Sequence, residues 1–356
     1  FRELLDTFGP EDARVFAAYY GASEGGNFEG VNILNVSRNP QAIADALGMP
    51  AGEMEAVLSR CRPRLLAVRG GRARPGLDDK TITAWNGLML RSFAEAAAAL
   101  DRSDYRDTAV ANAEFVTTKL YRDGRLLRTH RSGEAKLNAY LEDYAFLADG
   151  LLATYELTFD PRWFRTAVDL TETMIRLFWD DAAGGFFDTS TDHETLISRP
   201  KEVTDNAIPS GNSVAAGVLL RLARLTGRAD FEERTRRMLE LLADYMRQHP
   251  TAFGRLLCVL DDFLAPSQEI AIVGGMTDPA TQGLLSVVWG NFLPHKVVAL
   301  AAPEDRDAAE AIPLLRDRGQ VDGRATAYVC ENFACLLPVT DPEALAGQLG
   351  LAATPA

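Results

Sequence analysis

The chain has 356 residues, of which 47% are hydrophobic and 24% charged, a composition typical of a globular protein with a sizeable core. Its formal net charge is −13, and no run is rich in lysine and arginine. Because nucleic acids and anionic membranes are bound by clustered cations, this charge argues against both partners. No segment approaches the ~20 apolar residues that a membrane span requires. We expect one large domain, or one with a small appendage.

Three helical hairpins are predicted at steps of roughly 60 residues. Their first helices are apolar almost all round and cover residues 85–100, 144–157 and 213–225. Their second helices carry more charge and open on Tyr105, Trp163 and Phe231. Helices that are apolar on every side are buried, whereas those with a charged face lie outside. The pattern therefore predicts an inner ring of helices wrapped by an outer ring.

Long connections with glycines join these hairpins, at residues 123–138 and 182–204. Within them, the runs GRLLRTH and GGFFDTS are predicted to form short β-hairpins, as is the segment 25–34. Loops beside the N-termini of the inner helices would wall a cleft.

After about residue 265 the pattern changes. A strand-like run (SQEIAIVGG), a helix over 278–289 and a second strand (HKVVALAA) predict a β-α-β unit. A further strand (ATAYVC) and a short helix (DPEALAGQL) follow. We therefore predict a partial α/α-toroid domain over residues 1–264 and a small α/β appendage over 265–356. The Gly274-Gly275 pair is a tight turn, because the G-x-G-x-x-G dinucleotide pattern is absent.

Three polar clusters precede the predicted inner helices. They are Asp78-Asp79-Lys80 with Trp85-Asn86, the YLEDY run over 140–144, and Lys201-Glu202 with Asp205-Asn206 and Ser210-Gly211-Asn212. Helices repeated at one spacing place their N-termini at one end of the assembly. Acids, amides, aromatic rings and two lysines would then converge on a shared mouth.

The second and third clusters carry the chemistry of a sugar site. Aromatic rings offer flat faces to sugars, and carboxylates accept hydrogen bonds from hydroxyls. Paired carboxylates also serve as general acid and base in glycoside hydrolysis. The simpler alternative for these two clusters is helix capping. For the first cluster it is mutual neutralisation of Asp79 and Lys80, and Trp85 is equally a core residue or a stacking platform. We predict Asp143 and Asp205 as the acid/base pair, with Lys201 holding an anionic substituent.

The candidate site residues are therefore Glu142, Asp143 and Asp205 for catalysis. For ligand binding they are Asp79, Lys80, Trp85, Asn86, Tyr140, Tyr144, Phe186, Lys201, Glu202, Asn206, Ser210 and Asn212. No cofactor and no metal site is expected, because neither H-E-x-x-H nor any close histidine pair is present. The four histidines are scattered (His130, His193, His249, His295), which argues against a sugar epimerase that works with paired imidazoles.

Cys330 and Cys335 form a C-x4-C pair that suits a metal half-site or a disulfide. Without a second Cys/His pair, buried inert thiols are the favoured interpretation. The sparse cysteines predict a reducing compartment, hence a cytoplasmic protein.

Taken together, the motifs DDKTITAWNGLM, YLEDYAFLADGLLATYE, RPKEVTDNAIPSGNSVAA and AYVCENFACLLPVTDP resemble the C-terminal region of the thioredoxin-domain family that includes spermatogenesis-associated protein 20. The resemblance implies a mainly α fold, an (α/α)6 toroid of the six-hairpin glycosidase and N-acylglucosamine 2-epimerase type. It also implies a thioredoxin-like domain as a partner in the full-length protein. That domain and the first barrel hairpins are not recognised in this chain, so the toroid is expected to be incomplete.

Two functions remain open at this stage. The first is a carbohydrate-binding or carbohydrate-active domain with its pocket at the inner-helix N-termini. The second is a noncatalytic scaffold that serves a thioredoxin-like redox module, in which the polar clusters only cap and cross-link helices.

Overall fold

The computed structural model describes residues 1–194 and 197–351. The chain divides into two compact units, Phe1–Asp78 and Asp79–Ala356. Each unit is described by itself. Among the described residues, no helix is both long enough and apolar enough to cross a bilayer.

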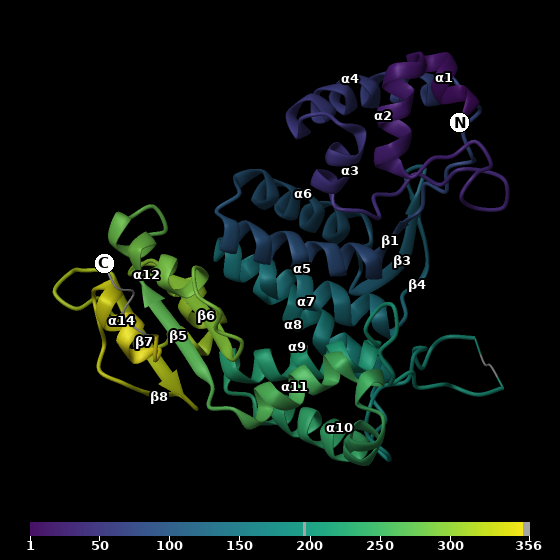
Figure 1. Ribbon diagram of the computed structural model, residues 1–356. Coiled ribbons are helices and arrows are strands. Elements are labelled where there is room, and N and C mark those ends of the chain that lie inside the picture. The colour runs from purple at the N-terminus through teal and green to yellow at the C-terminus, as the bar shows by residue number, and fades with distance from the viewer. Residues whose placement is uncertain (195–196, 352–356) are drawn as a thin grey trace. The chain divides into compact units, whose positions relative to one another are not determined.

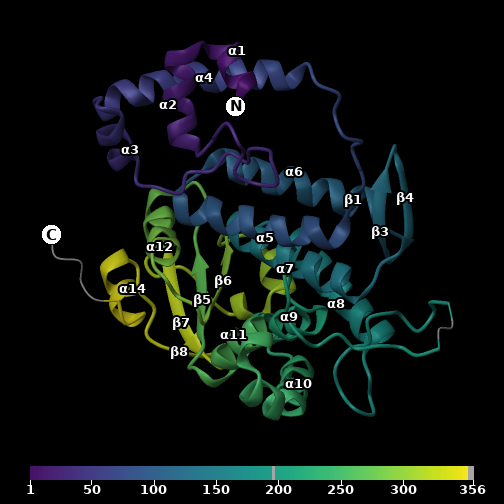
Figure 2. The same ribbon diagram turned by 45° about the vertical axis from the view of Figure 1, so that its right-hand side comes forward.

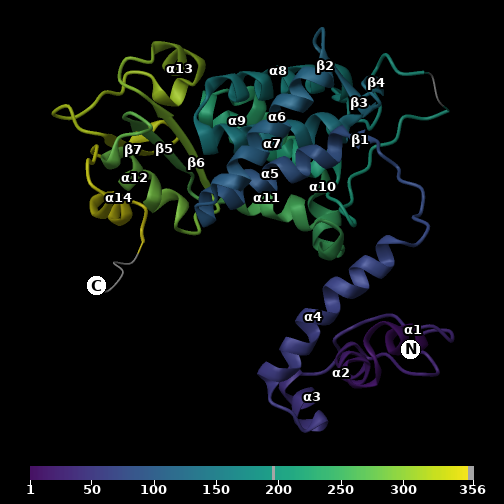
Figure 3. The same ribbon diagram turned by 90° about the horizontal axis from the view of Figure 1, so that it is seen from above.

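The first unit is a small helical assembly. It contains α1 (Arg2–Phe8), α2 (Pro10–Tyr20), α3 (Pro40–Leu47) and the long helix α4 (Ala51–Gly70), which Figure 3 shows most clearly. Its helices enclose a core of their own that includes Phe16, Ile43 and Leu58. The predicted β-hairpin at residues 25–34 is wrong, because only an isolated bridge between Phe28 and Val31 forms there.

The second unit contains the three predicted helical hairpins. They are α5 (Thr83–Leu100) with α6 (Ser103–Lys119), α7 (Leu141–Thr158) with α8 (Pro161–Phe178), and α9 (Gly211–Thr226) with α10 (Ala229–Gln248); η1 (Pro250–Ala252) and α11 (Gly254–Leu264) follow. Figure 1 shows the helices packed side by side. The inner helices are α5, α7, α9 and α11, and each of the three predicted ones begins two or three residues earlier than expected. Within the described residues the hairpins do not close a ring, so the fold is a mainly α, incomplete α/α toroid.

Burial distinguishes two of the inner helices from the outer ones. α7 and α9 are buried almost all round, whereas α8 and α10 keep charged, exposed faces, as predicted. α5 departs from the prediction, because its apolar residues Trp85, Met89 and Leu100 are exposed. The backbones of α5 and α7 cross in direct contact at Gly87 and Gly150. A Cβ at Gly87 would lie 2.5 Å from the carbonyl carbon of Phe146, and one at Gly150 would lie 2.7 Å from the carbonyl oxygen of Gly87. Both positions therefore exclude any side chain.

A small antiparallel ladder stands at one end of these helices (Figure 1). It consists of β1 (Thr81–Ile82), β2 (Tyr121–Arg122), β3 (Arg125–Arg131) and β4 (Glu134–Asn138), with β3 pairing to the other three. The predicted hairpin at GRLLRTH is thus confirmed. The hairpin predicted at GGFFDTS is wrong, since that segment forms only an isolated bridge between Trp179 and Phe186. Its backbone is engaged elsewhere: the Asn212 amide bonds both the N–H and the C=O of Phe186.

The C-terminal part forms a four-stranded sheet in the order β6-β5-β7-β8. Its elements are β5 (Gln268–Val273), α12 (Pro279–Trp289), β6 (Lys296–Ala301), α13 (Arg306–Ala311), η2 (Pro313–Leu315), β7 (Thr326–Glu331), β8 (Ala334–Cys335) and α14 (Pro342–Gln348). β5 and β6 are parallel and joined through α12, which confirms the β-α-β unit (Figure 2). One hydrophobic core runs from the hairpins into this sheet. The predicted boundary between residues 264 and 265 stays a prediction.

Candidate functional site

The N-termini of the inner helices α5, α7 and α9 lie together. The backbone N–H of Ala84 in α5 donates to Asp143 of α7 over 2.9 Å. A Cβ at Gly211, the first residue of α9, would lie 3.2 Å from the backbone nitrogen of Glu142. The long connection between α8 and α9 joins them, since Leu141 N–H donates to the carbonyl oxygen of Asp188 over 3.0 Å. We call these first turns and the described part of the connection 179–210 the mouth. The inner-helix N-termini therefore meet at one end of the hairpins, while the convergence of the predicted side chains on one ligand site stays a prediction.

Asp143 is fully buried at the centre of the mouth. Its Oδ1 accepts the Ala84 N–H, and its Oδ2 accepts the Tyr140 N–H over 2.9 Å and Nη1 of Arg128 over 3.0 Å. Burial raises the pKa of this carboxyl to about 6, and the Arg128 charge and the two amides reverse only part of that rise. The carboxylate thus links α5, α7 and β3, and it has no surface open to a ligand.

Asp205 makes a second cross-link of the same kind. Its Oδ1 accepts the Ser210 N–H over 2.8 Å, and its Oδ2 accepts the Arg255 N–H over 2.7 Å. The carboxylate therefore ties the loop before α9 to the first turn of α11, where free N–H groups need an acceptor.

Three more accessible carboxylates lie near the buried Asp143 and the partly buried Asp205. Glu142 pairs with Arg128 over 2.9 Å and keeps 30% of its side chain exposed. Asp188 is half-buried, and Glu202 is exposed. Burial raises the pKa of Asp188, and the negative charges of Glu202 and Glu142 add to that rise, while the Glu202 N–H that both its oxygens accept offsets part of it. Glu202 differs, because hydrogen bonds from Thr204 lower its pKa. The mouth therefore holds carboxylates with pKa values moved in opposite directions.

Asp188 is the residue that sequence reasoning missed. It lies in the GGFFDTS run, which the sequence predicts as a wall of the cleft without a catalytic role. The available signal was a single acid within a glycine- and aromatic-rich connection next to a polar cluster.

Most other residues of the second and third clusters already have structural partners. The Lys201 ammonium donates to Asp180 over 2.6 Å and to the Gly184 carbonyl over 2.7 Å, so its role in holding an anionic substituent stays a prediction. Ser210 caps α9 through the Ser213 N–H. Buried side chains that fix the connection or the β3 strand are Asn212, Phe186 and Tyr144.

The remaining candidates lie at the rim. Trp85 is 60% exposed on the first turn of α5, and Tyr140 is half-buried, with the Arg128 guanidinium 4.6 Å from its ring centroid. Asn86 donates to the carbonyl oxygen of Ile82, the N-cap of α5, and accepts from Asn112 of α6. Asp79 pairs with Arg131 over 2.5 Å. The side chains of Lys80 and Asn206 are exposed.

A second charged group, also unpredicted, lies deeper among the inner helices. Asp149 of α7 receives Arg91 of α5 over 2.6 Å and Arg221 of α9 over 2.9 Å, with Arg255 of α11 at 3.7 Å. Burial raises the pKa of Asp149, but the charges of Arg91, Arg255 and Arg221 outweigh it, so the pKa lies below its ordinary value. The sequence signal for such a centre is a charged residue among largely apolar neighbours on an inner helix, as at Asp149 and Arg221. The group ties four inner helices together.

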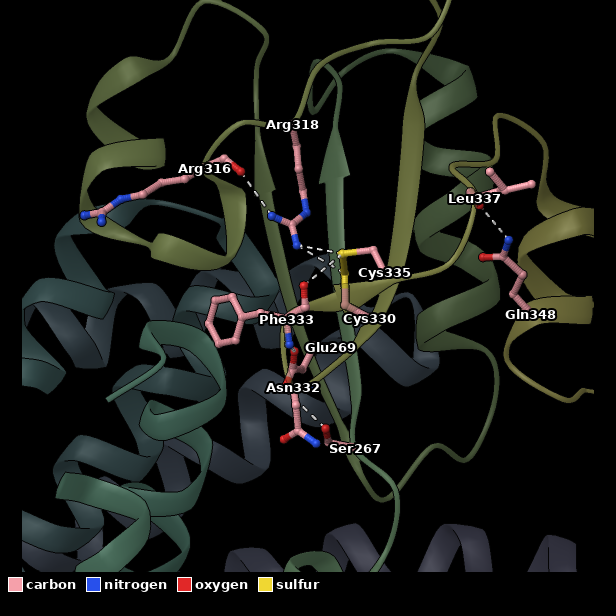
Figure 4. The surroundings of a disulfide bond; sticks show 10 residues. All are labelled: Ser267, Glu269, Arg316, Arg318, Cys330, Asn332, Phe333, Cys335, Leu337 and Gln348. Atoms are coloured by element: carbon pink, nitrogen blue, oxygen red, sulfur yellow. Dashed lines mark hydrogen bonds between the residues drawn. A yellow bond between two sulfur atoms is a disulfide. The ribbon is translucent and has the colours of Figure 1, made fainter. Parts of the chain in front are cut away.

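Cys330 and Cys335 form a disulfide (Figure 4). The prediction of buried inert thiols is therefore wrong. The two residues are directly opposite each other in the β7–β8 pair, a register that the spacing alone does not specify. Cys61 and Cys258 are free thiols.

Within residues 1–194 and 197–351, no group of three or more His, Cys, Asp or Glu side chains is arranged to hold a metal ion. An apolar groove runs between α10 and α11, and its lining includes Leu239, Met246, Leu257, Leu260 and Phe263. None of the predicted site residues lines it.

Comparison with solved structures finds partial likenesses to sugar enzymes. Cellobiose 2-epimerase from Spirochaeta thermophila is 17% identical, with a TM-score of 0.39 over 46% of this chain and 43% of that one. A family 105 glycoside hydrolase of C. acetobutylicum is 11% identical, with a TM-score of 0.38 over 58% of this chain and 61% of that one. The description of the fold rests on the helices and strands themselves.

Among sequences, no family model matches the chain. Spermatogenesis-associated protein 20 is 32% identical in Homo sapiens and 33% in Mus musculus, over 92% of this chain and 45% and 44% of those proteins. An uncharacterized protein of Caenorhabditis elegans is 24% identical over 95% of this chain and 47% of its own length. The chain thus spans less than half the length of these relatives. It is homologous to spermatogenesis-associated protein 20 over 92% of its own length.

Proposed function

We propose that the mouth binds a carbohydrate. The observation that carries this proposal is the cluster of accessible carboxylates Glu142, Asp188 and Glu202, in which two neighbours help to raise the pKa of Asp188. Carboxylates accept hydrogen bonds from sugar hydroxyls, and exposed aromatic rings such as that of Trp85 offer a stacking face.

The same cluster supports acid–base chemistry on a glycosidic bond. A carboxyl group with a raised pKa keeps its proton at higher pH and can protonate a leaving oxygen. Asp188 has that property, and Glu202, with its lowered pKa, stays ionised and can accept a proton from water. We assign Asp188 as the proton donor and Glu202 as the base of a glycoside hydrolysis. Asp143 is not carried forward in the acid/base pair because it has no surface open to a ligand. Asp205 is not carried forward because its two oxygens hold the loop before α9 to the first turn of α11.

A titration with sugars tests the binding proposal. Mono- and disaccharides that include glucose, cellobiose and mannobiose are titrated into the protein by calorimetry, and release of p-nitrophenol from matching glycosides is followed. We expect binding that weakens at least tenfold in Asp188→Asn and Glu202→Gln. Glu233→Gln, at an exposed position of α10, is the matched control and should bind as the unchanged protein does. Binding that is equal in all variants would place the sugar elsewhere.

A noncatalytic scaffold for a thioredoxin-like partner domain is the second candidate. It is favoured by one observation, namely that Asp143 and Asp205 are engaged as cross-links between helices. Under this proposal Asp205→Ala lowers the melting temperature, and no sugar in the panel raises it in the unchanged protein. A sugar that protects the unchanged protein but not Asp188→Asn would decide for carbohydrate binding.

A further inference from the structure

The Cys330–Cys335 disulfide lies in a hairpin whose turn is held by a buried acid. β7 and β8 are joined by a two-residue turn, Asn332-Phe333, and both residues have positive φ, 50° and 62°. Positive φ at both positions suits a tight hairpin but is unfavourable for phenylalanine. The Glu269 carboxylate of β5, only 1% exposed, accepts both turn N–H groups, over 3.2 Å and 2.8 Å. The two hydrogen bonds from the turn to Glu269 therefore stabilise a backbone conformation that the turn residues themselves disfavour.

A guanidinium points at both sulfurs (Figure 4). Nη2 of Arg318 lies 3.2 Å from Sγ of Cys330 and 2.9 Å from Sγ of Cys335, and Nη1 donates to the Arg316 carbonyl, which fixes its direction. Disulfide sulfurs are weak hydrogen-bond acceptors, whereas a thiolate is a strong one and carries the opposite charge. The position of Arg318 therefore suits the reduced state of the pair better than the oxidised state.

The two sulfurs differ in accessibility. Cys330 is 2% exposed and packs into the sheet, whereas Cys335 on the edge strand β8 is exposed. Only Cys335 can be reached by an external thiol. Attack there makes Cys330 the leaving sulfur, next to Arg318.

We propose that Cys330 and Cys335 form a thiol–disulfide exchange site whose partner is a dithiol. A thiolate of the partner attacks Sγ of Cys335, so a mixed disulfide forms and the Cys330–Cys335 bond breaks. Cys330 leaves as a thiolate that Arg318 stabilises. The second partner thiol then displaces Cys335, so the partner becomes a disulfide, and its two electrons and two protons reduce the pair to a dithiol.

Redox titration of the full chain tests the site, with dithiothreitol as the dithiol. The protein is equilibrated in buffers with increasing ratios of reduced to oxidised dithiothreitol, and free thiols are then trapped with N-ethylmaleimide. The mass of the tryptic peptide that follows Arg324 is measured by mass spectrometry. This peptide contains both cysteines, and the peptide with Cys258 reports general labelling. We expect no label in oxidised buffer and two labels in reduced buffer. Double labelling in every buffer would overturn the proposal.

The role of Arg318 is tested by Arg318→Gln against Arg316→Gln, a neighbouring exposed arginine. Loss of the Arg318 charge should move half-reduction to roughly tenfold higher ratios of reduced to oxidised dithiothreitol, and it should slow maleimide labelling of the reduced pair at pH 7. Arg318→Lys keeps the charge, so its half-reduction midpoint and its rate of maleimide labelling should lie close to those of the unchanged protein. Equal half-reduction midpoints in Arg318→Gln and Arg316→Gln, both shown to be folded by circular dichroism, would contradict a role for the Arg318 guanidinium in stabilising the reduced pair.

Single-cysteine variants test the direction of attack. With oxidised glutathione as the probe, Cys330→Ser should form a mixed disulfide at Cys335, and Cys335→Ser should form little at Cys330. Equal reaction of the two variants would contradict the assignment of Cys335 as the sulfur that is attacked.

Discussion

Oδ1 of Asp143 accepts a 2.9 Å hydrogen bond from the backbone N–H of Ala84, on a helix that begins almost 60 residues earlier. Through this contact one carboxylate joins the first turns of α5 and α7, and its second oxygen holds Arg128 of β3. The buried Asp143 carboxylate therefore holds together the elements that form the mouth, and the accessible carboxylates lie around it.

Asp143→Asn should destabilise the protein strongly. The amide keeps one acceptor but presents an N–H2 group to donors, so at least one buried donor loses its partner, which costs about 1–3 kcal/mol. Urea denaturation at pH 7 measures the change. Glu142→Gln, next in the chain and partly exposed, is the matched control and should cost less than about 1 kcal/mol.

The stability contributed by Asp143 should fall as the pH rises from 4 to 7. Its pKa in the folded protein is about 6, above that of an unfolded aspartate, so folding favours the protonated form. That contribution is fully present below about pH 4 and is lost as the pH passes 6, on the order of 3 kcal/mol in all. The difference in unfolding free energy between the unchanged protein and Asp143→Asn gives the profile. A difference that grows with pH would contradict the assignment.

Gly87→Ala should disrupt the contact between α5 and α7. The added methyl would lie 2.5 Å from the Phe146 carbonyl carbon, so the helices must separate, at a cost of about 1–3 kcal/mol or more. Gly254→Ala, at the first position of α11 with no atom within 4 Å of the new methyl, is the control. Thermal melting should show a lowered midpoint for Gly87→Ala only.

Asp149→Asn should cost more than any substitution at the rim. It leaves Arg91, Arg221 and Arg255 without the carboxylate they share, and removal of one partner from a buried ion pair costs about 3–5 kcal/mol. Glu95→Gln removes the exposed partner of Arg91 and should change the unfolding free energy by less than about 1 kcal/mol. Similar losses in the two variants would show that Asp149 is not the centre of the group.

Much of the helical arrangement could be predicted from the sequence because it depends on local patterns. The apolar first helices and the charged second helices have a periodicity that determines which face is buried, and the polar clusters mark the helix starts. The predicted helix starts were a few residues too late, at Tyr144 in place of Leu141 for example, because the Asp143 carboxylate lies inside the first turn of α7, where it accepts the N–H groups of Tyr140 and Ala84.

The chemistry of the site was less predictable because it depends on tertiary neighbours. Whether Asp143 or Asp188 is accessible depends on how α5, α7 and the long connection pack, which no spacing in the chain specifies. The Cys330–Cys335 bond likewise depends on a turn held by Glu269 from another strand.

The central claim, that the accessible acids of the mouth bind a carbohydrate, is tested most directly by calorimetric titration of the sugar panel into the unchanged protein and Asp188→Asn. We predict saturable binding of at least one sugar by the unchanged protein and a loss of at least tenfold in affinity for the variant, with both proteins melting within a few degrees of each other. No saturable binding to the unchanged protein, or binding that Asp188→Asn leaves intact, would contradict it.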